Sequence, residues 1–228
     1  VPPCLRIATK MCKQPQPMQE INLAQSLMRL YESLLDEFRD EEKVAEMNKL
    51  LQAVWLDSLF LFALVWSIGA SVDQEGRVKF DAMLRQLLAG DVPEELKIWM
   101  TAEPRKVTKL IPDANGATVY DFVFDKATGQ WAKWTATQED APIAEEATYT
   151  SIIVPPVDTI RYTYLIDTFV LHQKNFLFVG PTGTGKTAYI KQHVANGIDP
   201  EKYSYLFMNF SAQTSANMTQ VRPTHWSP

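Results

Sequence analysis

The sequence is poor in the side chains that build metal sites and disulfide frameworks. Only two cysteines, Cys4 and Cys12, and three histidines occur among its 228 residues. Their spacing matches no recognised metal-ligand pattern, so no structural zinc site is expected. We interpret both cysteines as reduced thiols of a cytoplasmic protein.

An excess of positive charge is also missing. The chain has 22 lysines and arginines against 27 acidic residues, a formal net charge of −5 and a pI near 5.3. This balance argues against a nucleic-acid partner that would be held by a broad basic face.

Long hydrophobic runs are absent as well. The longest uncharged run, SLFLFALVWSIGA from Ser58 to Ala70, is flanked by Asp57 and Asp73. It is shorter than the roughly 18 residues of a membrane-spanning helix, so we expect a buried core helix and no membrane partner. No basic stretch followed by an apolar one marks a signal peptide, and none is expected.

The first hundred residues carry a helical pattern. Apolar residues recur at helical spacing from Ile21 to Phe38, and an apolar segment predicts a second helix from about Val44 to Ile68. A third helix is expected from Phe80 to Ala89, ended by Gly90, which suits a left-handed C-terminal position.

The pattern changes after Pro104. The stretch TVYDFVFDKATGQWAKW, Thr118 to Trp134, alternates aromatic and polar residues about a turn and predicts a β-hairpin. Its aromatic residues suggest packing across the hairpin, with a ligand-binding aromatic box as the rarer alternative. They are Tyr120, Phe122, Phe124, Trp131 and Trp134.

The last third predicts alternating strands and helices. A polar connector from Glu139 and a short strand precede a helix that Asp158 or Thr159 can cap. A strand from Asn175 to Val179, a helix to about Asn196 and a second strand, YSYLFMNF, follow. Strand, helix and strand in this order predict an α/β fold with a parallel sheet.

The loop between the first strand and its helix fits the phosphate-binding pattern G-x-x-x-x-G-K-[ST] without a mismatch. Its glycines let backbone N–H groups surround phosphate oxygens, and the following helix presents its positive end to the same anion. Lys186 would contact the β- and γ-phosphates, and the Thr187 hydroxyl would ligate Mg²⁺. The predicted ATP-binding residues are Gly180, Pro181, Thr182, Gly183, Thr184, Gly185, Lys186 and Thr187, with Thr187 as the metal ligand.

Hydrolysis requires acidic residues that are missing downstream of this loop. No aspartate follows Asp199 and no glutamate follows Glu201. The acidic strand end FVFD, at Asp125, lies upstream in the predicted hairpin and is a weak candidate metal ligand. We therefore assign no catalytic residue to this chain.

Several segments together resemble a dynein heavy chain. FLFVGPTGTGKT followed by MNFSAQTSANMTQ is similar to the start of the third AAA+ module of that family, and SIIVPPVDTIRYTYLIDTF to the segment that enters it. INLAQSLMRLYESLL, WLDSLFLFALVWSIGA and GRVKFDAMLRQLL resemble the helical small subdomain of the second module. After Gln220 the family continues to the Walker B acids, whereas this chain reads VRPTHWSP, as expected for a shortened product.

The resemblance implies a fold class and a set of parts. We expect a helical AAA+ small (lid) subdomain over residues 1–103 and a hairpin with connector over 104–158. The N-terminal part of a P-loop NTPase large subdomain, incomplete before Walker B, would occupy 159–228.

The resemblance also implies a function. It indicates an ATP-driven microtubule motor, which the sequence of the helices suggests is axonemal, in which the loop is the Walker A loop of a regulatory site with ATP and Mg²⁺ as cofactors. Its partners would be the other AAA+ modules, the dynein intermediate and light chains, and microtubules, in the cytoplasmic cytoskeleton and the ciliary axoneme.

Two alternatives stay open. A small-molecule or nucleotide kinase could use the same loop, but it would need several arginines over the phosphates, and Arg222 is the only arginine after Thr187. The other alternative is a structural segment without binding activity, because few strands follow the loop.

Overall fold

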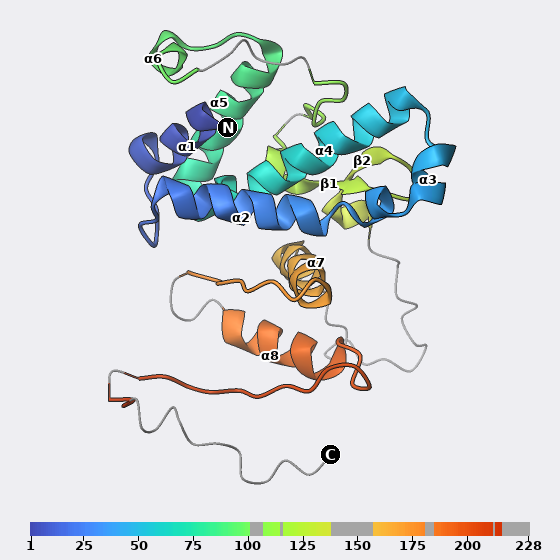
Figure 1. Cartoon of the computed structure of the whole chain (residues 1–228). Coiled ribbons are helices and arrows are strands. Elements are labelled where there is room, and N and C mark those ends of the chain that lie inside the picture. The colour runs from blue at the N-terminus through green and yellow to red at the C-terminus, as the bar shows by residue number, and fades with distance from the viewer. Residues whose placement is uncertain (101–106, 115, 138–156, 181–184, 212, 216–228) are drawn as a thin grey trace, which may run out of the picture. The chain divides into compact units, whose positions relative to one another are not determined.

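The structure is a computed structural model that describes residues 1–100, 107–114, 116–137, 157–180, 185–211 and 213–215 (Figure 1). The chain divides into two compact units, Val1–Lys186 and Thr187–Pro228, which we describe separately. Helices predominate in the first unit, and the sheet found among the described residues is a two-stranded hairpin.

The elements of the first unit follow in chain order. They are α1 (Pro2–Arg6), the π-helix η1 (Ile7–Met11), α2 (Glu20–Ser33), the 3-10 helix η2 (Asp36–Arg39), α3 (Glu41–Glu46), α4 (Lys49–Ser67), the 3-10 helix η3 (Gly69–Ser71), α5 (Gln74–Ala89), α6 (Glu94–Lys97), the 3-10 helix η4 (Val119–Asp121), β1 (Phe122–Asp125), β2 (Gln130–Lys133), the 3-10 helix η5 (Trp134–Ala136) and α7 (Val157–Leu171). Helix α8 (Lys186–Asn196) starts at the boundary and belongs mainly to the second unit.

The helix predicted from Ile21 to Phe38 ends earlier, at Ser33. The Ser33 hydroxyl donates to the Arg29 carbonyl, Leu34 is the C-cap, and Leu35 leaves the helical conformation before η2. The apolar pattern continued because Leu34 stays buried and the Phe38 ring lies 6.4 Å from Trp55, edge to face. The apolar periodicity of the sequence therefore reflected burial of side chains that lie beyond the end of α2.

The second predicted helix is divided into α3 and α4. Met47 is extended, and the Asn48 side chain accepts from the Leu51 N–H at 2.8 Å, which starts a new helix. Helix α4 has ten buried residues, as expected for a core helix. By length and composition the segment Lys49–Ser71 could cross a membrane, but 67% of its most apolar window is buried inside the protein.

Helix α5 ends as predicted, with Gly90 in the left-handed conformation at φ 84°. It begins six residues before the predicted start, because the Asp73 carboxylate accepts from the Gly76 N–H at 2.8 Å. Capping chemistry, rather than apolar periodicity, set this boundary.

The predicted hairpin is confirmed. Strands β1 and β2 pair antiparallel with Phe124 opposite Trp131, whose rings are 5.7 Å apart. Trp134 Nε1 donates to the Tyr120 carbonyl at 3.1 Å, and Phe122 is buried with them. The aromatic residues form part of the core, so the packing interpretation holds.

A close contact fixes the end of α4 against this core. The Tyr120 hydroxyl donates to the Gly69 carbonyl at 2.8 Å. A Cβ on Gly69 would lie 2.7 Å from Phe80 Cε1 and 2.8 Å from the Tyr120 hydroxyl oxygen, so only glycine fits.

Both cysteines are free thiols, and burial raises the pKa of Cys4 to about 11.

Candidate functional site

The structure describes the first residue of the candidate phosphate-binding loop and its last three. Pro181–Thr184 lie outside the described residues, whereas Gly180, Gly185, Lys186 and Thr187 are described. Gly185 has φ 75°, a left-handed conformation that side chains rarely adopt. The second glycine of the motif, Gly185, thus has a backbone conformation that favours glycine.

The Lys186 side chain turns back toward the beginning of the loop. A Cβ placed on Gly180 would lie 3.3 Å from Lys186 Cδ and 3.5 Å from its Nζ. A side chain at position 180 would therefore compete with the lysine for this space. The ammonium group thus lies beside Gly180, where the loop starts, and its role in phosphate binding stays a prediction.

The loop leads directly into the N-terminus of α8. Lys186 is the first residue of this helix and Thr187 the second, and no acidic residue occupies its first turn. The positive end of the helix therefore has no compensating carboxylate from its own first turn, which suits an anion. Thr187 as a Mg²⁺ ligand remains a prediction.

The segment that precedes the loop packs on α7 with the alternation of a strand. Phe176 stacks on Phe169 at 5.5 Å, and Phe178 lies 5.4 Å from Tyr162. Leu177, between them, is 79% exposed. The predicted strand from Asn175 to Val179 has no ladder partner among the described residues and is not assigned as a strand.

The second predicted strand, YSYLFMNF in the second unit, also makes side-chain contacts without being assigned as a strand. Lys191 Nζ of α8 lies 5.3 Å from the centroid of the Phe207 ring. The centroids of the Phe207 and Tyr205 rings are 5.2 Å apart. Leu206 and Phe210 are exposed, and the segment is not assigned as a strand. The predicted parallel sheet is therefore not found in the described part of the chain.

Helix α7 is fixed near its start by an ion pair with the hairpin region. Arg161 donates to Asp121 at 2.5 Å and to Asp158 at 3.0 Å. Burial would raise the pKa of Asp121, but hydrogen bonds from Thr118 and the charge of Arg161 outweigh it and lower this pKa. In the middle of α7, the Tyr164 ring packs edge to face on other core aromatics (Phe62 at 5.6 Å and Trp134 at 5.4 Å).

Asp125, the weak candidate for a metal ligand, has a structural role at the hairpin turn. Its carboxylate accepts from the Thr128 hydroxyl at 2.7 Å and from the Ala127 N–H at 3.0 Å, and these two bonds lower its pKa. Both oxygens thus serve the turn.

Sequence reasoning missed the polar contacts that hold α7. Asp121 and Arg161 are 40 positions apart, and Asp36 and His172, which also interact, are 136 apart. Neither pair forms a motif, and the only available signal was the polar character of His172 and Lys174 at the end of an apolar helix.

Comparison with known families identifies both parts of the chain. The model of the dynein heavy chain AAA lid domain matches residues 1–136. The chain belongs to the dynein heavy chain family. The model of the P-loop containing dynein motor region matches residues 141–222 and includes the whole candidate loop.

Individual dynein heavy chains agree with this membership. The chain is 38% identical to mouse dynein axonemal heavy chain 3 over an alignment of 228 positions that covers 96% of this chain and 6% of the relative. It is 41% identical to mouse dynein axonemal heavy chain 12 over 71% of this chain and 5% of the relative. With human dynein axonemal heavy chain 2 the identity is 32%, over 92% of this chain and 4% of the relative.

The chain thus spans a small part of the length of these axonemal dyneins. The family match establishes an AAA+ P-loop region with mixed helices and a small two-stranded sheet. The relatives are named as axonemal dynein heavy chains.

Proposed function

We propose that residues Gly180 to Thr187 bind Mg·ATP as the Walker A loop of the third AAA+ module of an axonemal dynein heavy chain. The observation that carries this proposal is the Lys186 side chain, which returns to Gly180 at the start of the loop. The match to the P-loop containing dynein motor region supports it independently.

The chain offers three groups to a nucleotide. Backbone N–H groups and the N-terminus of α8 attract the phosphates, Lys186 adds a full positive charge, and Thr187 supplies one oxygen ligand for the metal. When bound, Mg²⁺ would offset phosphate charge. The left-handed Gly185 and the space occupied by Lys186 beside Gly180 fit this group.

Within a longer heavy chain, this site would be a regulatory one. The motor would couple ATP turnover in a ring of AAA+ modules to movement along microtubules of the axoneme. Residues 1–103 would act as the lid of the second module and 159–228 as the start of the third, with the hairpin and connector between them. Other modules of the ring, together with intermediate and light chains, would be its partners.

The chain by itself should bind ATP without hydrolysing it. Positioning a water and holding the metal both require carboxylates after the loop, and the sequence has none beyond Glu201. We expect no phosphate release above that of a Lys186→Ala control. Steady release that this substitution abolishes would contradict the proposal.

Calorimetric titration with Mg·ATP tests the binding site. Replacing Lys186 with alanine removes a charge-assisted contact and should weaken affinity by more than about tenfold, or about 1.4 kcal/mol. Lys202→Ala is the matched control, since Lys202 pairs with Asp199 on the surface at 3.3 Å. Equal affinity of folded wild-type and Lys186→Ala protein would disprove the assignment of the loop.

A second candidate function is a structural segment without nucleotide affinity. It is favoured by the exposed apolar residues that flank the loop, Leu177 and Val179 before it and Leu206 and Phe210 after α8. The same titration decides: no binding by wild-type protein with a native far-ultraviolet spectrum would support this candidate.

A further inference from the structure

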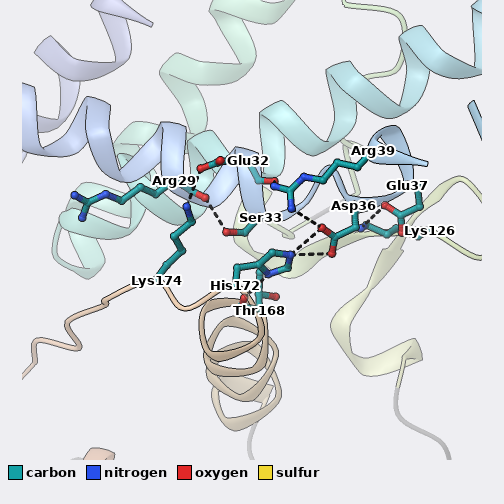
Figure 2. Close-up of polar contacts among 10 residues, drawn as sticks. All are labelled: Arg29, Glu32, Ser33, Asp36, Glu37, Arg39, Lys126, Thr168, His172 and Lys174. Carbon is teal, nitrogen blue, oxygen red and sulfur yellow. Dashed lines mark hydrogen bonds and ion pairs between the residues drawn. The ribbon is translucent and has the colours of Figure 1, made fainter. Parts of the chain in front are cut away.

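Two side chains at the C-terminal end of α7 contact residues 1–136, the lid region (Figure 2). Nε2 of His172 lies 2.9 and 2.8 Å from the two carboxylate oxygens of Asp36, and Nδ1 of the same ring lies 2.7 Å from the Thr168 carbonyl oxygen. Lys174 Nζ donates to Glu32 Oε2 at 2.8 Å. We call the contacts of Asp36 and Glu32 with the end of α7 the clamp.

The lid side of the clamp is cross-linked by its own contacts. Glu32 is the second-last residue of α2, and Asp36 is the first residue of η2. The Arg39 guanidinium donates to the Glu32 carbonyl at 3.0 Å and lies 3.3 Å from an Asp36 carboxylate oxygen. The two carboxylates of the clamp therefore come from one corner of the lid region, where a single arginine joins them.

Between the two clamped residues of α7 the backbone is strained. Gln173 has φ 53° and is the one non-glycine residue with a positive φ in the part of the chain that the structure describes. This left-handed conformation costs free energy in a residue that carries a side chain. The N–H groups of Gln173 and Lys174 close the helix end by bonding to the Val170 and Phe169 carbonyls, at 3.1 and 2.8 Å. Contacts on both sides of Gln173 can offset its strain.

The strained turn decides how the segment before the loop leaves α7. Residues 175–180 follow the turn directly, and the rings of Phe176 and Phe178 pack on α7. The segment ends at Gly180, beside which the Lys186 side chain lies. A turn held in one conformation gives the segment one direction, and so gives the start of the loop one place relative to α7.

We propose that Glu32 and Asp36 are positioning residues for the nucleotide site, because they hold the strained turn from which the loop segment starts. This inference rests on the proposed binding of Mg·ATP at the loop and adds its regulation by the lid region. With the clamp formed, the start of the loop is ordered before the nucleotide arrives, so binding does not have to order it. With the clamp broken, Gln173 can relax to a negative φ, and the competent conformation becomes only one of several, which lowers the apparent affinity.

Calorimetric titration of the full chain with Mg·ATP tests the clamp. Glu32→Gln removes the charge that faces Lys174, and Asp36→Ala removes the oxygens that face the His172 ring. The side chains of Glu32 and Asp36 are 58% and 43% exposed. Each substitution should therefore weaken affinity by about twofold to fivefold, the size expected for one exposed polar contact.

The matched control is Glu37→Gln. Glu37 lies beside Asp36 in the chain and pairs at 2.8 Å with Lys126 of the hairpin turn. Its substitution removes a charge and an ion pair from the same corner of the lid region but leaves the clamp in place. Glu37→Gln should keep the affinity of wild-type protein.

Two further variants separate positioning from a general loss of structure. In a Gln173→Gly background the turn is no longer strained, so adding Glu32→Gln should weaken affinity by less than about 1.5-fold. Exchange of the charges, Glu32→Lys together with Lys174→Glu, should restore affinity to within about twofold of wild type. Glu32→Lys alone places two cations together and should weaken affinity more than Glu32→Gln does.

Amide hydrogen exchange provides a readout without nucleotide. The N–H groups of Gln173 and Lys174 close the helix end, so their exchange reports on the turn. Relative to α4 amides, they should exchange about twofold to fivefold faster in Glu32→Gln and Asp36→Ala than in wild-type protein. Exchange equal to wild type in both variants would contradict the clamp whatever the affinities are.

The titrations distinguish failure of the clamp from failure of the nucleotide site. Wild-type affinity in Glu32→Gln and Asp36→Ala, with weakened binding in Lys186→Ala, would overturn this inference and leave the nucleotide site standing. An undiminished loss in the Gln173→Gly background would also overturn it, because the clamp would then not act through the turn. Absence of binding by folded wild-type protein would overturn the proposed function and this inference together.

Discussion

The lid region, residues 1–136, and the loop region, residues 157–215 as described, differ in what they bury. In the lid region, α4 alone contributes ten buried residues and the hairpin buries Phe122, Val123 and Phe124 in succession. In the loop region, α8 has no buried residue, and Leu177 and Phe210 are exposed. Helices and a hairpin satisfy their hydrogen bonds locally, whereas strands of a parallel sheet need neighbours.

This difference predicts where a core substitution will matter most. Trp134 is buried among Phe62, Trp66 and Tyr164, and its indole N–H is bonded to the Tyr120 carbonyl. Trp134→Ala should lower the free energy of unfolding by about 3–5 kcal/mol, measured by urea denaturation with near-ultraviolet circular dichroism.

The contrasting substitution in the loop region is Phe210→Ala. Phe210 is 66% exposed, so its removal should change the free energy of unfolding by less than about 0.5 kcal/mol. Similar effects of the two substitutions would show that Phe210 is buried to the same extent as Trp134 and would break the comparison.

Acid should act on the contact that joins the two regions. Because the pKa of Asp121 is lowered in the folded state, its stabilisation is present above the unfolded-state pKa of about 4 and is lost as the pH falls through the folded value. Asp121→Asn should cost about 1 kcal/mol at neutral pH, a figure reduced for partial exposure, and little at pH 2–3.

The matched control for this prediction is Asp158→Asn. Asp158 bonds to the same arginine, Arg161, but its side chain is 58% exposed, so a smaller loss is expected. Thermal unfolding between about pH 2 and pH 7 measures both variants. Equal losses at pH 7 and at pH 2–3 for Asp121→Asn would show that its role is not electrostatic.

Sequence patterns predicted the lid region well because its signals are local. Gly90 marked the end of α5, and the aromatic alternation around the turn marked the hairpin. Boundaries failed where a cap decided them, at Asn48 and Asp73, or where burial continued past the helix, at Leu34. Apolar periodicity carries no information on such caps.

In the loop region the helices α7 and α8 were predicted, but the two strands were not found as strands. Their side-chain alternation is present: Phe176 and Phe178 face α7 while Leu177 is exposed. The pattern thus encoded the side-chain alternation, whereas a ladder also needs partner strands. At the loop itself, Gly185 is left-handed and the Lys186 side chain lies beside Gly180, and nucleotide binding by these residues stays a prediction. The contact of His172 with Asp36 joins residues 136 positions apart and carries no sequence motif.

The smallest expected effect compares how helices end in the two regions. Helix α5 ends at Gly90, with φ 84° and no atom within 4 Å of an added Cβ, whereas the left-handed residue after α7 is Gln173, at φ 53°. A left-handed conformation costs a side-chain-bearing residue about 1 kcal/mol, part of which the flexibility of unfolded glycine offsets. Gln173→Gly should therefore raise the free energy of unfolding by about 0.5 kcal/mol, and Gly90→Gln should lower it by about 1 kcal/mol. Urea denaturation measures both. A loss of stability in Gln173→Gly would mean that the Gln173 side chain contributes more than its backbone conformation costs, and the difference between the two helix ends would then be an adaptation of α7.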